Sequence, residues 1–332
     1  MSDPAPGQPS GGPRITRRTV QVILGVIWLL DGALQFQPYM FTRDFLTQVI
    51  QSSAQGQPAV VSDPITFAIH LVQPILVPAN AAFAIIQVLI GLGLIFSRRT
   101  VKAALVVSFV WALTVWWFGE GFGMLTMGMA SSLTGAPGAV IVYLLIGLMV
   151  WPTDRPERVS AASGGPLGDA GGRVVWAVLW VLLAVLMFLP DNFGRAAVSQ
   201  TLAGAAGDAP GPLSSLDTAL AHATAGQGVW LGILLALIMT VVGLGVLVDR
   251  GRNALLAIGA LLSLLLWITT ESVGGLLTGS ATDPNTGPLV VLMALALLRR
   301  GAVRAQAPAV AEPASHRSRS PEPAGGDGGA AP

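Results

Sequence analysis

The 332-residue chain contains no cysteine and few charged residues. The lack of cysteine excludes disulfides, thiolate metal sites, iron–sulfur clusters held by protein thiolates and thiol catalysis. Charged residues make up 11% of the chain, against roughly 25% in an ordinary soluble domain, which excludes a soluble enzyme of the usual kind. The 18 basic and 17 acidic residues leave a net charge of only +1, which fits neither a nucleic-acid binder nor a disordered protein.

Hydrophobic residues, in contrast, make up 53% of the chain. A run of roughly 20 apolar residues can cross a bilayer as a helix that satisfies its own backbone hydrogen bonds. Eight such runs are present, at residues 19–40, 79–97, 101–118, 136–151, 173–190, 228–248, 253–270 and 287–299. The fourth and eighth are short, and they reach span length only if the turn before each one begins in the interface. The pattern predicts an all-α integral membrane protein with eight transmembrane helices.

The basic residues predict the orientation of these helices, because short cytoplasmic loops retain Lys and Arg. With the N-terminus inside, 16 of the 18 basic residues are cytoplasmic, and Arg43 and Arg195 are the exceptions. We therefore expect a multi-pass protein of the cell membrane with both termini in the cytoplasm. Residues 1–18 and 300–332 are expected to be a disordered arm and tail, and the Pro/Gly/Ser-rich segment 152–172 a cytoplasmic linker.

The two halves of the chain resemble each other. A shift of 152 residues pairs rare residue types in the same order: Trp28 with Trp180, Arg43 with Arg195, Gln48 with Gln200 and His70 with His222. A shift of 151 residues pairs Trp116 with Trp267 and Glu120 with Glu271. Shared hydrophobicity would not match such residues. The sequence thus predicts a tandem duplication, with four-helix repeats at 19–151 and 173–299 that insert in parallel, since each has an even number of spans.

The segments 41–78 and 191–227 follow the first span of each half and are predicted to form short interfacial helices on the outer side. Ionisable residues beside hydrocarbon indicate a functional site by default. The candidate ligand-binding or proton-relay residues are Arg43, Gln48, His70, Glu120, Arg195, Gln200, His222 and Glu271. Arg43 with Glu120, and Arg195 with Glu271, are the expected ion pairs. The alternative is that these pairs only tie the interfacial helices to the bundle.

Asp31 is a further candidate, and it breaks the symmetry between the halves. It lies inside the first span, whereas the matching position in the second half is Leu183. The difference suggests that only the first half retains full activity. The alternative is a hydrogen bond between helices beside Gly32. Methionines 124, 127 and 129 are not repeated in the second half and are interpreted as packing, so no metal site is predicted.

Two segments carry a resemblance to a known family. VILGVIWLLDGALQF and NAAFAIIQVLIGLGLIFSRRTVKAALVVSFVWAL resemble the DoxX-like superfamily of small four-helix membrane proteins, whose second span often ends in a Gly-rich stretch followed by a basic turn. The resemblance covers residues 19–151 and again 173–299, and it transfers no catalytic residue to a numbered position. It implies a four-helix bundle per half and, as in some members, association with membrane redox enzymes that use quinone.

Three functions fit these observations. The first is a DoxX-like membrane subunit or accessory protein that binds a quinone or a small anion at the outer membrane boundary, with the lipid bilayer and a membrane redox enzyme as partners and no nucleic acid. The second is a small-solute transporter with its site between the two repeats. The third is a structural or assembly factor without a ligand of its own. Whether the chain is an enzyme stays open.

Overall fold

The computed structural model describes residues 15–299, and within this range all regular structure is helical. The predicted C-terminal tail and all but four residues of the predicted N-terminal arm lie outside the described residues. The first helix begins where the sequence provides a cap, because the Thr16 hydroxyl accepts a hydrogen bond from the Thr19 N–H at 3.1 Å.

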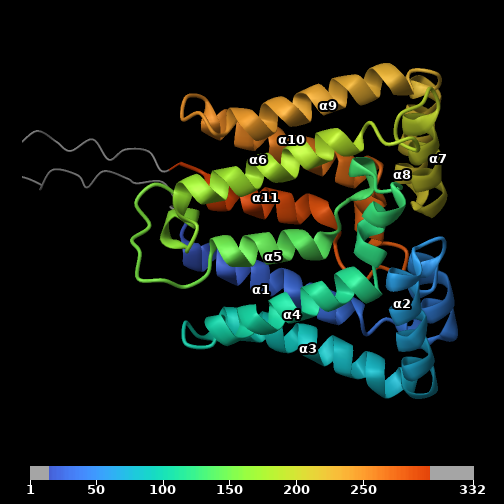
Figure 1. The fold of residues 1–332 in the computed structure, drawn as a ribbon, viewed down its shortest axis with the longest axis horizontal. Helices are drawn as coiled ribbons and strands as arrows, with labels where there is room; N and C mark the ends of the chain where they lie inside the picture. Colours follow the sequence, from blue (N-terminus) through green and yellow to red (C-terminus); the bar gives the residue numbers. More distant parts are fainter. Residues whose placement is uncertain (1–14, 300–332) are drawn as a thin grey trace, which may run out of the picture. The chain divides into compact units, whose positions relative to one another are not determined.

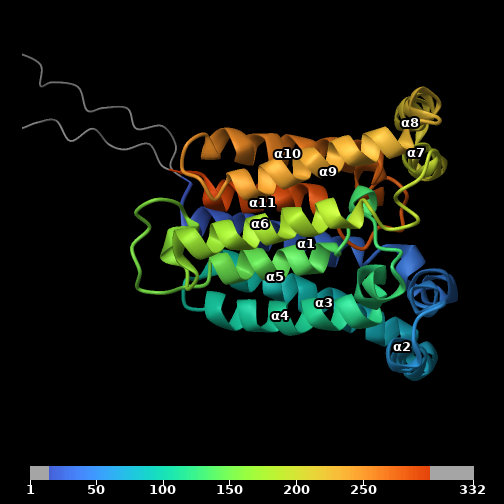
Figure 2. The same cartoon turned by 45° about the horizontal axis from the view of Figure 1, so that its top comes forward.

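Eight helices lie side by side in one bundle (Figures 1 and 2). They are α1 (Arg17–Leu34), α3 (Leu76–Phe96), α4 (Val101–Phe118), α5 (Ala139–Met149), α6 (Gly168–Leu186), α9 (Gly228–Gly245), α10 (Arg252–Thr269) and α11 (Thr286–Leu297). Five helical stretches are long and apolar enough to cross a membrane: Ala59–Phe96, Val101–Phe118, Gly168–Leu186, Gly228–Gly245 and Arg252–Thr269. A multi-pass helical membrane protein is therefore compatible with the structure. Of the other three, α1 carries Arg17, Arg18 and Asp31, and α5 and α11 are shorter.

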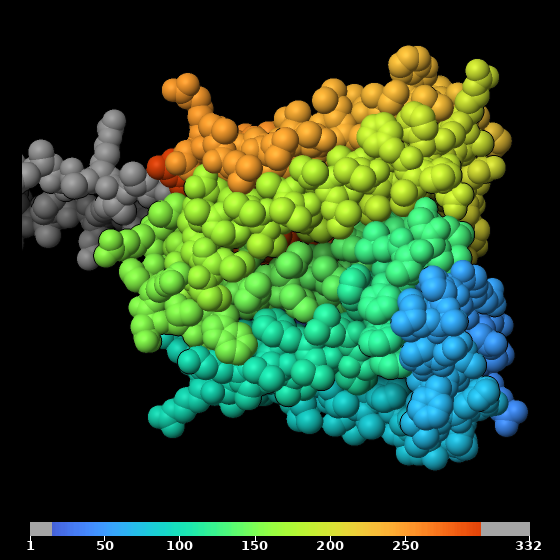
Figure 3. Space-filling view, viewed as in Figure 1, coloured from blue at the N-terminus to red at the C-terminus, as the bar shows by residue number. Residues whose placement is uncertain are grey.

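Three further helices lie across one end of this bundle: α2 (Ala59–Val72), α7 (Ala197–Asp208) and α8 (Gly211–Thr224). Figure 3 shows the segment of α2, in blue, covering this end of the first half. The remaining helical segments are short 3-10 or π turns at Pro38–Phe41, Phe45–Ile50, Ser52–Ala54, Gln73–Ile75, Gly121–Met127, Ser132–Thr134, Ala162–Gly164 and Ser272–Gly275. Short helices thus occur in both segments, 41–78 and 191–227, where the sequence predicts them.

Helices α5 and α11 contact each other at the centre of the bundle. The loops that precede them, 119–138 and 270–285, fold back into the end of the bundle where α2, α7 and α8 lie. Buried residues of the first loop hydrogen-bond to the second half, since the Ser132 hydroxyl donates to the Leu183 carbonyl at 2.6 Å and Asn192 Nδ2 donates to the Ala130 carbonyl at 2.7 Å. Irregular backbone is tolerated at membrane depth where the protein itself satisfies its polar groups.

Matching contacts recur in the two halves. Helix α1 packs on α3, and α6 packs on α9. Each pair approaches closely at a glycine: a Cβ on Gly91 would lie 2.7 Å from the Gly25 carbonyl oxygen, and one on Gly243 would lie 2.8 Å from the Trp180 Cβ. The indole of Trp116 donates to the Pro137 carbonyl at 2.8 Å, as that of Trp267 does to the Pro284 carbonyl at 2.6 Å.

The opposite end of the bundle carries most of the basic residues. The turns between α3 and α4, between α5 and α6, and between α9 and α10 all lie there with the start of α1 (Figure 1). The segment predicted as a linker is ordered at this end, and α6 begins inside it at Gly168. The reason is an ion pair that the sequence pattern does not reveal: buried Arg252 donates to both carboxylate oxygens of Asp169, at 2.7 and 2.8 Å.

Candidate functional site

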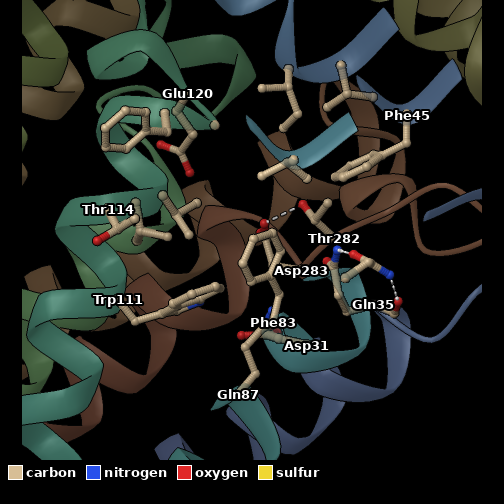
Figure 4. A pocket seen from close by; sticks show the side chains of 18 of the residues that line it. Asp31, Gln35, Phe45, Phe83, Gln87, Trp111, Thr114, Glu120, Thr282 and Asp283 are labelled. Atoms are coloured by element: carbon tan, nitrogen blue, oxygen red, sulfur yellow. Dashed lines mark hydrogen bonds between the residues drawn. The ribbon is translucent and has the colours of Figure 1, made fainter. Parts of the chain in front are cut away.

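A cavity of about 350 Å³ lies among the helices of the first half. Helices α1, α3, α4 and α5 form its walls, and α2 with the turn Phe45–Ile50 covers it at the end of the bundle. Figure 4 shows how the labelled side chains surround this space. Its lining is mostly apolar, and the polar side chains in it are Asp31, Gln35, Asn80, Gln87, Thr114, Glu120, Tyr143, Thr282 and Asp283.

Asp31 is the most buried of the acidic residues that line this cavity. It lies in the last third of α1 and is 2% exposed. The Tyr143 hydroxyl of α5 donates to its Oδ2 at 2.5 Å, whereas its Oδ1 is buried and has no hydrogen-bond partner. Trp28 holds the tyrosine ring in place, with 4.6 Å between the ring centroids. One carboxylate oxygen of Asp31 therefore has no partner within residues 15–299, and the residue itself lines the cavity.

Two amides form a second polar group on the cavity wall. Asn80, near the start of α3, donates to the Gln35 carbonyl at 3.0 Å, and Gln35 Nε2 donates back to Asn80 Oδ1. Both residues are buried. Because the Asn80 side chain bonds both the main-chain carbonyl and the side-chain amide of Gln35, it fixes the position of α3 against the end of α1.

Glu120 follows the end of α4 and faces the same cavity. Its Oε2 is buried without a hydrogen-bond partner, although some of its surface faces the cavity. Burial, together with the nearby charge of Asp283, raises the pKa of Glu120 to about 8. The carboxyl fits because residue 138 is glycine with φ of +112°: a Cβ at Gly138 would lie 1.9 Å from Glu120 Oε2.

Asp283 is contributed to this cavity by the second half of the chain. It lies in the loop before α11, with its neighbour Thr282 also at the cavity wall. The Thr282 hydroxyl donates to Asp283 Oδ2 at 2.9 Å, and the Asn285 N–H donates to Oδ1 at 2.7 Å. Burial raises the pKa of Asp283, and these hydrogen bonds oppose the rise. Gln37 Nε2 at the end of α1 donates to the Ala281 carbonyl at 3.0 Å and so holds the loop against the first half.

A second cavity, of about 370 Å³, adjoins the first and has a more polar lining. The two share Glu120, Asp283 and their neighbours Gly119, Thr282 and Val49. Exposed residues such as Thr134 and Met129 lie on the lining of the second cavity. Glu120 and Asp283 therefore stand between an inner, largely apolar space and an outer, more polar one, and we call the second space the vestibule.

The corresponding place in the second half is nearly filled. A space of only about 20 Å³ lies there among Trp180, Leu183, Met239, Glu271, Thr286 and Val290. Leu183 and Met239 match Asp31 and Gln87 by the 152-residue shift. Val290 matches Tyr143, since each lies six residues after a proline that accepts the tryptophan hydrogen bond. Three polar residues of the first half are thus replaced by apolar residues in the second.

Glu271 occupies the place in the second half that Glu120 occupies in the first. The Thr286 hydroxyl donates to Glu271 Oε1 at 2.8 Å. Burial raises the pKa of Glu271 to about 7, less than for Glu120, because this hydrogen bond opposes the rise. In the first half, the residue after Gly138 is Ala139, which has no hydroxyl to offer Glu120.

Of the nine residues selected from the sequence, only Asp31 and Glu120 line the cavity of the first half. Six of the others are exposed at the α2, α7 and α8 end of the bundle: Arg43, Gln48, His70, Arg195, Gln200 and His222. The ion pairs formed within residues 15–299 link other residues, so the expected pairs Arg43–Glu120 and Arg195–Glu271 are not formed. The reason is that both arginines project from the transverse segments to the surface, and the two glutamates point inward.

The sequence reasoning missed Asp283, Gln87 and Tyr143. Gln87 of α3 and Tyr143 of α5 line the same cavity as Asp31. The available signal was a lone amide and a lone tyrosine in otherwise apolar runs. For Asp283 no local signal exists, since the loop that carries it crosses from the other half.

No family model, no curated protein and no solved structure matches this chain.

Proposed function

We propose that this chain is a DoxX-like integral membrane protein that binds a small, largely apolar ligand in the cavity of its first half, at the outer membrane boundary. The observation that carries the proposal is the cavity itself, whose volume of about 350 Å³ falls in the range of roughly 300–1,000 Å³ typical of small-molecule sites. Apolar walls with a few convergent polar groups are what such sites use to bind and orient a ligand.

The proposed membrane arrangement has eight spans, with the cavity in the outer leaflet. The short helices α5 and α11 have 11 and 12 residues and are about 17 Å long at 1.5 Å per residue. The loops before them would complete the crossing. The described basic residues other than Arg43 and Arg195 lie at or near the end opposite α2, α7 and α8, which supports a cytoplasmic location for that end in the cell membrane.

We also propose that the eight spans arose by duplication, with the site retained in the first copy alone. The matched tryptophan hydrogen bonds and the matched helix pairs support the duplication. The filled space around Leu183, Met239 and Val290 supports the loss of the second site.

Of the ligands predicted from the sequence, a quinone agrees with this cavity better than an anion does. Its ring and tail require apolar walls, and its carbonyl oxygens require donors such as the amide of Gln87 or the neutral carboxyl of Glu120. An anion would require a cation, and Arg43 and Arg195 are exposed away from the cavity. The quinone is therefore the first compound to test.

The test is thermal unfolding of the full chain in detergent with a benzoquinone that carries a decyl tail. We expect the midpoint to rise with quinone concentration, because a ligand that binds only the folded state stabilises it by mass action. Gln87→Met introduces the residue of the second half and should reduce the shift. Met239→Leu, a volume-conserving change in the filled space, is the matched control and should leave the shift unchanged.

The proposal fails if the quinone, uncharged aromatic hydrocarbons and charged aromatic ammonium compounds all leave the unfolding midpoint unchanged. It also fails if Gln87→Met and Met239→Leu reduce the shift equally, because binding would then lie outside the cavity of the first half.

A further inference from the structure

We propose that the cavity of the first half recognises ligands with a cationic head, an organic ammonium on an apolar body, and that such a ligand displaces the proton of Glu120. The inference rests on the proposed function, because it requires that the cavity binds small molecules. It goes beyond that function by naming the charge of the preferred ligand and the proton exchanged for it.

The charges on the walls point to a cation. Asp31, Glu120 and Asp283 bring three carboxyl groups to one cavity, each from a different segment of the chain. Among the residues that line the cavity and the vestibule there is no lysine, arginine or histidine. A ligand with a positive charge would supply the counter-ion that the protein does not provide.

The free oxygen atoms show that this acidic cluster is not a closed network. Asp31 is 2% exposed and lines the cavity, yet its Oδ1 has no hydrogen-bond partner. Glu120 Oε2 is likewise buried without a partner. A buried polar oxygen without a partner is costly, and a cationic ligand in the cavity would offset the cost of burying these acidic side chains.

The aromatic residues that line the cavity favour an organic cation over a metal ion. The aromatic rings of Trp28, Phe45, Phe83, Trp111 and Phe118 line the cavity, and aromatic faces attract ammonium groups within about 6 Å of the ring centroid. Within residues 15–299, His, Asp and Glu side chains nowhere gather in groups of three or more that could hold a metal ion. The site combines charge and aromatic surface in the way that ammonium recognition requires.

The release of a proton on binding follows from the protonation state of Glu120. Its pKa of about 8 keeps this carboxyl protonated at neutral pH. The titratable groups that share the cavity with it are Asp283 from the loop before α11, Asp31 from α1 and Tyr143 from α5. When the ammonium enters, the Glu120 carboxyl loses its proton to water in the vestibule, and the carboxylate pairs with the ligand. One positive charge enters and one leaves, so the net charge of the site is unchanged.

The test compares two probes of the same shape in the full chain. Benzyltrimethylammonium carries a fixed positive charge and no titratable proton, and neopentylbenzene is its uncharged carbon isostere. Calorimetric titration in buffers of different ionisation enthalpy counts the protons released on binding. At pH 7 we expect about one proton per bound ammonium and none for the isostere. We expect the affinity for the ammonium to rise about tenfold from pH 6 to 7 and about fivefold from pH 7 to 8, as the pH approaches the pKa of Glu120.

Two variants locate the proton. Glu120→Gln should abolish its release and the pH dependence of binding, because the amide imitates the protonated acid but cannot ionise. Glu271→Gln, the same change in the second half, should retain both. The inference is overturned if the isostere binds as tightly as the ammonium at pH 8.5, or if proton release survives Glu120→Gln. The proposed function survives either of those outcomes, and it fails with the inference only if the ammonium, the isostere and the quinone all fail to bind.

Discussion

Each half of the bundle has a glutamate just after a matching helix, Glu120 after α4 and Glu271 after α10, but the surroundings of the two differ. Around Glu120 the chain leaves a cavity of about 350 Å³, with Asp31 and Tyr143 on its walls. Around Glu271 the space shrinks to about 20 Å³, with Leu183 and Val290 in their places. The comparison teaches that the matched helix pairs alone do not produce the cavity. Several side chains on its walls differ between the halves, and exchanging them tests which ones matter.

The largest loss of stability is expected from introducing an aspartate at position 183, which matches Asp31 in the second half. Leu183→Asp would bury a carboxyl in a filled apolar space without a partner such as Tyr143, and we expect it to lower the free energy of unfolding by about 3 kcal/mol or more. Asp31→Leu removes one oxygen that lacks a partner and one that accepts from the Tyr143 hydroxyl, and it should cost less because it buries no new charge. The unfolding midpoints of the two purified variants in detergent check this order. Equal losses would show that the two positions are equivalent.

A smaller loss of stability is expected from a substitution at Gly138, the glycine against which the Glu120 carboxyl packs. In Gly138→Ala the new Cβ would meet Glu120 Oε2 at a residue whose φ is +112°. Strain and clash together should lower the free energy of unfolding by about 2 kcal/mol. Gly128→Ala is the matched control, because its φ of +70° brings the same kind of strain with nothing within 4 Å of the Cβ. Chemical denaturation of the two variants should show the greater loss for Gly138→Ala.

The pH dependence of stability distinguishes the two glutamates. Both pKa values are raised in the folded protein, Glu120 to about 8 and Glu271 to about 7, from an ordinary value of 4.5. Through these two carboxyls the folded state binds more protons than the unfolded state in this range, so their contribution to stability is fully present below about pH 4.5 and is lost as the pH rises toward 8. Glu120→Gln should flatten this fall more than Glu271→Gln. Thermal unfolding between pH 5 and 8 measures both slopes, and an increase in stability across the range would contradict the assignment.

The smallest effect on stability is expected from removing the Thr286 hydroxyl. Thr286→Ala removes the donor to Glu271 and should raise the pKa of Glu271 toward that of Glu120, at a cost of about 1 kcal/mol. Ala139→Thr is the reciprocal change and should lower the pKa of Glu120. Carbon-13 labelling of glutamate carboxyls in the purified protein follows both titrations. If neither pKa moves, the difference between the halves does not arise from this hydrogen bond.

The sequence predicted the helices well because their signal is local. Runs of apolar residues mark α3, α4, α9 and α10 within a few residues, and the short helices that carry His70 and His222 lie where they were expected. The loop that brings Asp283 to Glu120 was out of reach, because contacts between distant segments leave no mark in local composition.

Most of the residues that recur in both halves do not line the cavity. Residues repeated in both halves were preferred, and this selected Arg43, His70 and their counterparts, which are exposed. The cavity depends instead on positions that differ, such as Gln87 against Met239. Asp31, chosen because it breaks the symmetry, was the better guide. In this bundle, the positions that differ between the two halves line the cavity, and the charged and polar residues that recur at the transverse end are exposed.

The position of Asp283 has a consequence for how the chain can change. This residue belongs to the second half but lines the cavity of the first, and Gln37 of the first half holds its loop in place. A first half expressed alone would lack one acidic wall and leave its cavity open on that side. The second half therefore completes the cavity of the first, although its own corresponding space is nearly filled.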